Sequence, residues 1–167
     1  LEQARRWNLC PILRKDFTVE PYQVVEARSM GADAILLIAA VLSKAEVQAL
    51  TDTAHQLGLE VLLEIHGEEE LDRVVPGIDA IGVNSRDLHS FKTDPEHALR
   101  MQPLLPKELV HVAESGISGP AWAARLRQAG YQGLLIGEAF MRTADPAATC
   151  AAFVRELASF TPEKQPA

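Results

Sequence analysis

One pattern recurs along almost the whole chain: a helical segment, a glycine, and then a short apolar run. Glycines 31, 58, 77 and 130 each follow a predicted helix and stand just before a predicted strand. Helices commonly end in a left-handed residue, and glycine adopts that conformation without steric cost. The predicted strands are 10–14, 33–38, 60–65, 79–83, 109–114 and 133–137. Continuous apolar strands are typical of parallel sheets covered on both faces, so the chain is predicted to be α/β.

Helix start signals stand in the gaps between these strands. Residues 1–8 have the pattern of the end of a helix, and Pro21 stands where a first helical position is expected. Ser43 followed by Glu46 forms a capping box, in which the hydroxyl and the carboxylate satisfy free N–H groups of the first turn. Asp145, followed by proline, opens the last predicted helix in the same way.

The bulk composition is that of one globular domain. The chain has 167 residues, of which 47% are hydrophobic and 23% charged. We expect the domain to cover residues 1–160 and a disordered tail to follow at 161–167. No apolar run reaches membrane-spanning length, and a net charge of −7 argues against nucleic acid or an anionic membrane as partner. An anionic substrate would therefore need a local group of cations and backbone N–H donors.

Cysteine and histidine usage predicts no disulfide and no metal site. Cys10 and Cys150 are the two cysteines and are far apart in sequence, which favours reduced thiols in a cytoplasmic protein. None of the histidines has metal-ligand spacing. They are His55, His66, His89, His97 and His111.

Six βα units fit either an open doubly wound sheet or an eight-unit barrel that lacks two units. Polar or glycine-containing groups follow nearly every predicted strand, and neither a GxGxxG element nor a Walker-type loop is present. In an open sheet the ligand contacts gather where the strand order reverses, whereas in a barrel every strand end faces one central pocket. The radial distribution favours the barrel: an incomplete (βα)8 TIM barrel with six parallel strands.

Two charged side chains stand at strand ends. Lys15 would lie in the barrel mouth, where its ammonium can protonate a carbonyl; the alternative is a solvated lysine paired with Asp16. Glu64 is embedded in an apolar strand, which is costly unless the carboxylate is paired or used. Its alternative is a structural partner for Lys15 or Arg86. The two interpretations overlap, because an acid and a base that face one pocket also attract each other.

Further polar groups follow later strands. Asn84 and Arg86 offer donors suited to orienting a substrate carboxylate, or else a structural network of Arg86 with Asp87 or Glu64. The last two strands end in Ser115-Gly116 and Gly137-Glu138. Either glycine alone suggests an ordinary turn, but glycines on consecutive final strands favour phosphate binding by backbone N–H groups. We expect the Glu138 carboxylate to point away from such a site.

Read together, these segments resemble indole-3-glycerol-phosphate synthase. The resemblance runs in unbroken order from about residue 1 to 158, and its most specific elements are Lys15-Asp16-Phe17 and Asn84-x-Arg86-Asp87-Leu88. The segments that carry it are 11–17, 21–23, 31–38, the strand that contains Glu64, 81–88, 113–117 and 135–141.

The resemblance implies a decarboxylating ring closure in tryptophan biosynthesis, without metal or organic cofactor. The family converts 1-(2-carboxyphenylamino)-1-deoxyribulose 5-phosphate to indole-3-glycerol phosphate. Lys15 matches its general acid, Glu64 its catalytic glutamate, and Asn84 and Arg86 its substrate-orienting groups. The residues that fall around substrate and phosphate are Ser115, Gly116, Gly137 and Glu138. Those near the apolar wall for the anthranilate ring are Phe17, Leu36, Phe91 and Ile117.

The chain departs from the family pattern at its N-terminal side, where a full member has about two more βα units and a leading helix. The first of these strands carries another glutamate and a second catalytic lysine. We therefore expect this polypeptide alone to be weakly active or inactive, and to need a longer chain, a completing partner or self-association. Two other functions stay open: another phosphate-binding barrel enzyme, such as a phosphoribosylanthranilate isomerase-like protein, and a non-catalytic fragment that associates through exposed strand edges.

Overall fold

The computed structural model describes residues 1–87 and 90–160 and contains one six-stranded parallel sheet with the order β1-β2-β3-β4-β5-β6. The strands are β1 (Leu13–Arg14), β2 (Ala34–Ile38), β3 (Glu60–Ile65), β4 (Ala80–Asn84), β5 (Val110–Glu114) and β6 (Gly133–Leu135). Every strand pairs with its neighbour in sequence, so the order never reverses. A doubly wound sheet requires such a reversal. The prediction of an incomplete barrel with six parallel strands is therefore confirmed.

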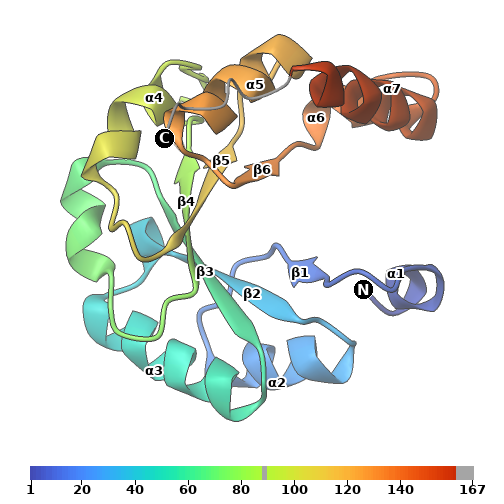
Figure 1. Ribbon diagram of the computed structural model, residues 1–167. Helices are drawn as coiled ribbons and strands as arrows, with labels where there is room; N and C mark the ends of the chain where they lie inside the picture. The colour runs from blue at the N-terminus through green and yellow to red at the C-terminus, as the bar shows by residue number, and fades with distance from the viewer. Residues whose placement is uncertain (88–89, 161–167) are drawn as a thin grey trace, which may run out of the picture.

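Most of the helices lie along the outer side of the curled sheet, as Figure 1 shows, and β1 and β6 form the two ends of the arc. The α-helices are α1 (Glu2–Trp7), α2 (Pro21–Ser29), α3 (Lys44–Gln56), α4 (His97–Met101), α5 (Pro120–Ala129), α6 (Glu138–Met141) and α7 (Pro146–Ser159). Three short 3-10 turns complete the connections: η1 (Ala39–Val41), η2 (Glu68–Arg73) and η3 (Gln102–Leu104).

The predicted helix signals are found where the sequence places them. Pro21 is the first residue of α2. The Glu46 backbone N–H donates to Ser43 Oγ over 3.3 Å, and the Ser43 N–H donates to Glu46 Oε2 over 2.7 Å, which completes the capping box. The Asp145 side chain accepts the Ala148 N–H at the start of α7. All four glycines predicted to end helices have positive φ, as in the C-cap of α5, where Gly130 has φ 115°.

The first strand is shorter than predicted. The sequence suggests a strand over 10–14, but only Leu13 and Arg14 belong to β1. The Ile12 N–H donates to the Asp33 carboxylate over 2.7 Å rather than to a strand, and proline at position 11 has no N–H to offer. The predictions made for Leu88, His89 and the tail 161–167 fall outside the described residues.

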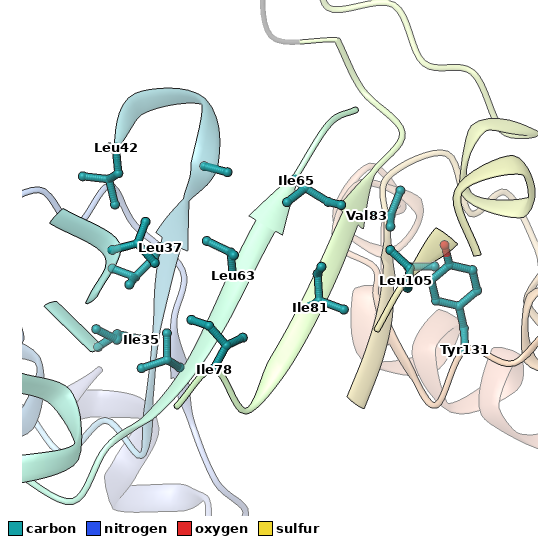
Figure 2. Packing of buried hydrophobic residues seen from close by; sticks show 14 of the residues in the cluster. Ile35, Leu37, Leu42, Leu63, Ile65, Ile78, Ile81, Val83, Leu105 and Tyr131 are labelled. Carbon is teal, nitrogen blue, oxygen red and sulfur yellow. The ribbon is translucent and has the colours of Figure 1, made fainter. Parts of the chain in front are cut away.

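Side-chain alternation along the strands builds two apolar layers. On β2, Ile35 and Leu37 face the helices, in the cluster that Figure 2 shows, whereas Leu36 and Ile38 face the inner side of the curl. The residues from Ile35 to Ile38 are each at most 4% exposed, because both faces of this strand are covered, and this explains why the run is apolar. The same alternation on the other strands decides which polar side chains face the inner side.

Candidate active site

The inner side of the curl gathers polar side chains at the carboxyl ends of the strands. Leu62 on β3 and Val112 on β5 belong to the inner apolar cluster, and two residues later each strand turns a carboxyl to the same side. These carboxyls are Glu64, 2% exposed, and Glu114, 1% exposed. Because parallel strands end at one edge of the sheet, alternation alone brings the two groups together.

The ammonium of Lys15 lies between these two carboxyls. Its Nζ donates to Glu64 Oε2 over 2.7 Å and lies 3.0 Å from Glu114 Oε2. The predicted proximity of Lys15 and Glu64 is therefore found. Two buried acids and one partly exposed cation form a cluster that combines proton donors and acceptors at one point.

Burial and charge set the protonation of this cluster. Burial tends to lower the pKa of Lys15, but the adjacent carboxyl of Glu114 and the hydrogen bond to Glu64 outweigh it and leave that pKa raised. Burial tends to raise the pKa of Glu64, yet hydrogen bonds, including the one from Lys15, hold it below its ordinary value. Burial, reinforced by the charge of Glu64, raises the pKa of Glu114 to about 8. At neutral pH the cluster thus holds one ammonium, one carboxylate and one neutral carboxyl.

Asn84 is the last residue of β4, and Arg86 follows the strand at the same edge. The Arg86 backbone N–H donates to Asn84 Oδ1 over 3.1 Å, which fixes the turn between them. The Arg86 guanidinium pairs with the Glu138 carboxylate. Glu138 was expected to point away from the site, and this expectation is wrong, because its carboxylate reaches across to a cation at the strand ends.

The segment after β5 has an unusual backbone. Ser115 has φ 62° and Gly116 has φ 69°, two consecutive left-handed residues. Serine rarely adopts this conformation, and such strain is concentrated at functional sites. A Cβ on Gly116 would also lie 2.7 Å from Thr93 Cγ2, so the glycine is required both by its backbone and by its neighbour.

A cavity of about 470 Å³ opens beside the Lys15 ammonium. Seven of the predicted site residues line it: Lys15, Arg86, Ser115, Gly116, Ile117, Gly137 and Glu138. The volume lies within the range of small-ligand sites. Glu64 and Asn84 do not line the cavity, but each contacts a residue that does: Glu64 contacts Lys15, and Asn84 contacts Arg86.

The structure does not bring the four predicted apolar residues together. Ile117 lines the cavity, and Leu36 is buried in the inner cluster. Phe17 is 54% and Phe91 74% exposed, and neither lines the cavity. A role for these residues in holding an aromatic ring stays a prediction.

Two residues of the site were missed in the sequence. Glu114 was not singled out, although it is the last residue of β5 and stands, like Glu64 on β3, near the carboxyl end of its strand. Arg142 lines the cavity, one helical turn after Glu138, and adds a third cation to Lys15 and Arg86. A search for charged residues directly at strand ends would have found Glu114, whereas Arg142 becomes visible only when α6 is placed.

Within residues 1–87 and 90–160, no group of three or more histidine, cysteine, aspartate or glutamate side chains could hold a metal ion. Over the same residues, no helix is long and apolar enough to cross a membrane.

Comparison with known proteins gives a consistent family. The model of the family described as indole-3-glycerol phosphate synthase matches residues 1–156. The indole-3-glycerol phosphate synthase of Bacteroides thetaiotaomicron is 50% identical over 147 residues, which are 88% of this chain and 56% of the relative. That of Koribacter versatilis is 47% identical over 158 residues, which are 94% of this chain and 59% of the relative. The chain thus spans a little over half the length of these relatives.

Solved structures agree on the fold. A structure titled "Native KDPGal structure" superposes with a TM-score of 0.67 at 18% identity, covering 95% of this chain and 73% of the other. KGPDC from Streptococcus mutans superposes with a TM-score of 0.73 at 11% identity, covering 94% and 76%. At these identities the likeness concerns the architecture alone.

Proposed function

Because this chain belongs to the indole-3-glycerol phosphate synthase family, we propose that its site takes part in the decarboxylating ring closure that forms indole-3-glycerol phosphate. The substrate is 1-(2-carboxyphenylamino)-1-deoxyribulose 5-phosphate, the products include carbon dioxide and water, and the step belongs to tryptophan biosynthesis in the cytoplasm. The observation that carries the proposal is the Lys15 ammonium, which is held between Glu64 and Glu114 at the wall of a cavity of about 470 Å³.

Lys15 is the general acid of this proposal. Because its pKa is raised, it is an ammonium at neutral pH and can polarise and protonate the ribulose carbonyl as the aromatic carbon attacks. Glu64 has a lowered pKa, so it is a carboxylate and can accept the proton that the new ring loses in the dehydration. The hydroxyl leaves as water with a proton that the reprotonated Lys15 donates. Glu114 is a neutral carboxyl below about pH 8 and lies close enough to return a proton to Lys15.

The remaining cavity residues bind and orient the substrate in this proposal. Asn84 and Arg86 orient its carboxylate, and Arg142 adds positive charge at the same wall. The residues proposed around substrate and phosphate are Ser115, Gly116, Gly137 and Glu138. Those proposed to hold the anthranilate ring are Phe17, Leu36, Phe91 and Ile117. Correct placement of the ring against the carbonyl supplies much of the acceleration in such a reaction.

A fluorescence assay for indole-ring formation tests the activity. The chain is assayed alone and together with the N-terminal segment of the Bacteroides thetaiotaomicron relative, because the chain covers 56% of that protein. We expect weak or no turnover alone and turnover in the mixture. If neither the chain alone nor the mixture forms the indole ring, and a phosphoribosylanthranilate isomerase substrate is turned over instead, the chain belongs functionally to the isomerase class.

Two variants test the assigned roles in the active mixture. Lys15→Ala and Glu64→Gln are each expected to lower turnover by at least about 100-fold, the scale of a positioned acid or base. Lys107→Ala, which changes an exposed lysine before β5, is the matched control and is expected to leave turnover unchanged. Near-normal turnover in both site variants would refute the roles.

We further propose that the open ends of the sheet are covered in the working protein, by a completing segment or by a second copy. Strand edges that remain unpaired invite association. Measuring the mass in solution separates the possibilities: a monomer that binds the N-terminal segment supports completion, and a stable oligomer of this chain supports self-association. A monomer that does not bind the segment would refute both.

A further inference from the structure

Gly82 on β4 stands where no other residue would fit without displacing its neighbour. It is buried, and it pairs with Glu64 of β3 and Val112 of β5. A Cβ at this position would lie 2.1 Å from Glu114 Oε1 and 3.3 Å from Leu62 Cδ1. The first distance is far below any contact that a real Cβ makes, so the carboxyl and a side chain at position 82 cannot share this space.

The backbone does not explain the glycine. Gly82 is not among the residues with positive φ. An inner-facing strand position is normally filled by a side chain, and glycine in a strand weakens it unless another group approaches closely. Here the approaching group is the Glu114 carboxyl, which fills the missing volume and is 1% exposed.

We propose that Gly82 is a positioning residue, whose missing Cβ leaves the space in which the Glu114 carboxyl lies against the Lys15 ammonium. Nζ and Oε2 are 3.0 Å apart in this arrangement. Alanine at position 82 displaces the carboxyl toward the open cavity, so that it regains water and separates from Lys15. A catalytic consequence of this displacement rests on the proposed function. The placement of the Glu114 carboxyl by Gly82 can be tested without any substrate.

The first experiment follows the titration of the Glu114 carboxyl by carbon-13 NMR of the full chain. With Gly82→Ala, the midpoint is expected to fall from about 8 toward the ordinary carboxyl value, by at least about one pH unit. Gly119→Ala is the matched control, because a Cβ there meets nothing within 4 Å, and it is expected to leave the midpoint unchanged. An unchanged midpoint in a folded Gly82→Ala variant overturns the proposal.

The second experiment measures how fast an amine reagent modifies Lys15 at about pH 9, where Glu114 is ionised, with mass spectrometry as the readout. Loss of the neighbouring charge raises the free-amine fraction, so Gly82→Ala is expected to increase the rate at least about threefold. In a Glu114→Ala background the same substitution is expected to have no effect, because the group through which it acts is gone. An equal increase in both backgrounds overturns the proposal.

A variant that fails to fold is also informative. The loss of thermal stability caused by Gly82→Ala is compared in the native chain and in the Glu114→Ala background. A loss that largely disappears with Glu114→Ala supports the proposal, and equal losses overturn it. None of these measurements uses turnover, so a negative ring-closure assay and a failed placement are distinguishable.

Discussion

Glu114→Gln is expected to make the folded chain more stable at alkaline pH and to change how its stability depends on pH. The carboxyl is 1% exposed, and its pKa is raised from 4.5 to about 8 by burial and by the charge of Glu64. Glutamine keeps the size of the side chain and removes the ionisation. The variant therefore isolates the cost of placing a charge in this cluster.

The sign follows from proton binding. Between about pH 4.5 and pH 8 the unfolded chain has lost the Glu114 proton while the folded chain retains it, so the free energy of unfolding falls as pH rises through this window and is level above it. The full difference corresponds to about 5 kcal/mol. Because Lys15 and Glu64 take part in the same ionisation, we expect a smaller effect. The free energy of unfolding of Glu114→Gln, relative to that of the native chain, is expected to rise by about 2–4 kcal/mol from pH 5 to pH 8.

Urea unfolding at a series of pH values, followed by circular dichroism, measures this difference. Titrating groups outside the cluster of Lys15, Glu64 and Glu114 contribute equally to both proteins and cancel when the two free energies are subtracted. Glu108→Gln, which alters an exposed carboxylate in the turn before β5, is the control and is expected to give a difference that does not vary with pH. Parallel pH profiles for the native chain and Glu114→Gln would show that the buried carboxyl does not retain its proton.

Two further predictions concern the scaffold. Leu63→Ala removes a fully buried side chain between β3 and the outer helices and is expected to lower the free energy of unfolding by about 2–5 kcal/mol, measured by urea denaturation; a loss below about 1 kcal/mol would contradict close packing there. Asp145→Ala removes the side chain that accepts the Ala148 N–H at the start of α7 and is expected to cost about 1 kcal/mol, while Asp145→Asn keeps an acceptor and most of the stability. Equal losses in the two Asp145 variants would contradict the capping role.

The order of elements could be read from the chain because it depends on local chemistry. Apolar runs covered on both faces, prolines at first helical positions and glycines with positive φ each act over a few residues. Local patterns do not distinguish an open sheet from a barrel. The presence of polar groups after nearly every strand favoured the barrel, because in a barrel all strand ends face one pocket. The strand boundaries depend on more distant contacts. β1 has two residues rather than the predicted five, because the Ile12 N–H donates to the Asp33 carboxylate, 21 positions away, and not to a strand.

The site divides in the same way. The chain alone determined that Lys15, Glu64, Arg86 and the glycine-bearing strand ends lie at one edge, because parallel strands bring their carboxyl ends together. Only the tertiary structure decided that Glu114 forms a second ion pair with Lys15 and that Glu138 pairs with Arg86. The register of the strands and the volume left by neighbouring strands decide which strand-end charges share a partner. Gly82 makes room for the Glu114 carboxyl but stands 32 residues before it, so no local sequence pattern indicates this role.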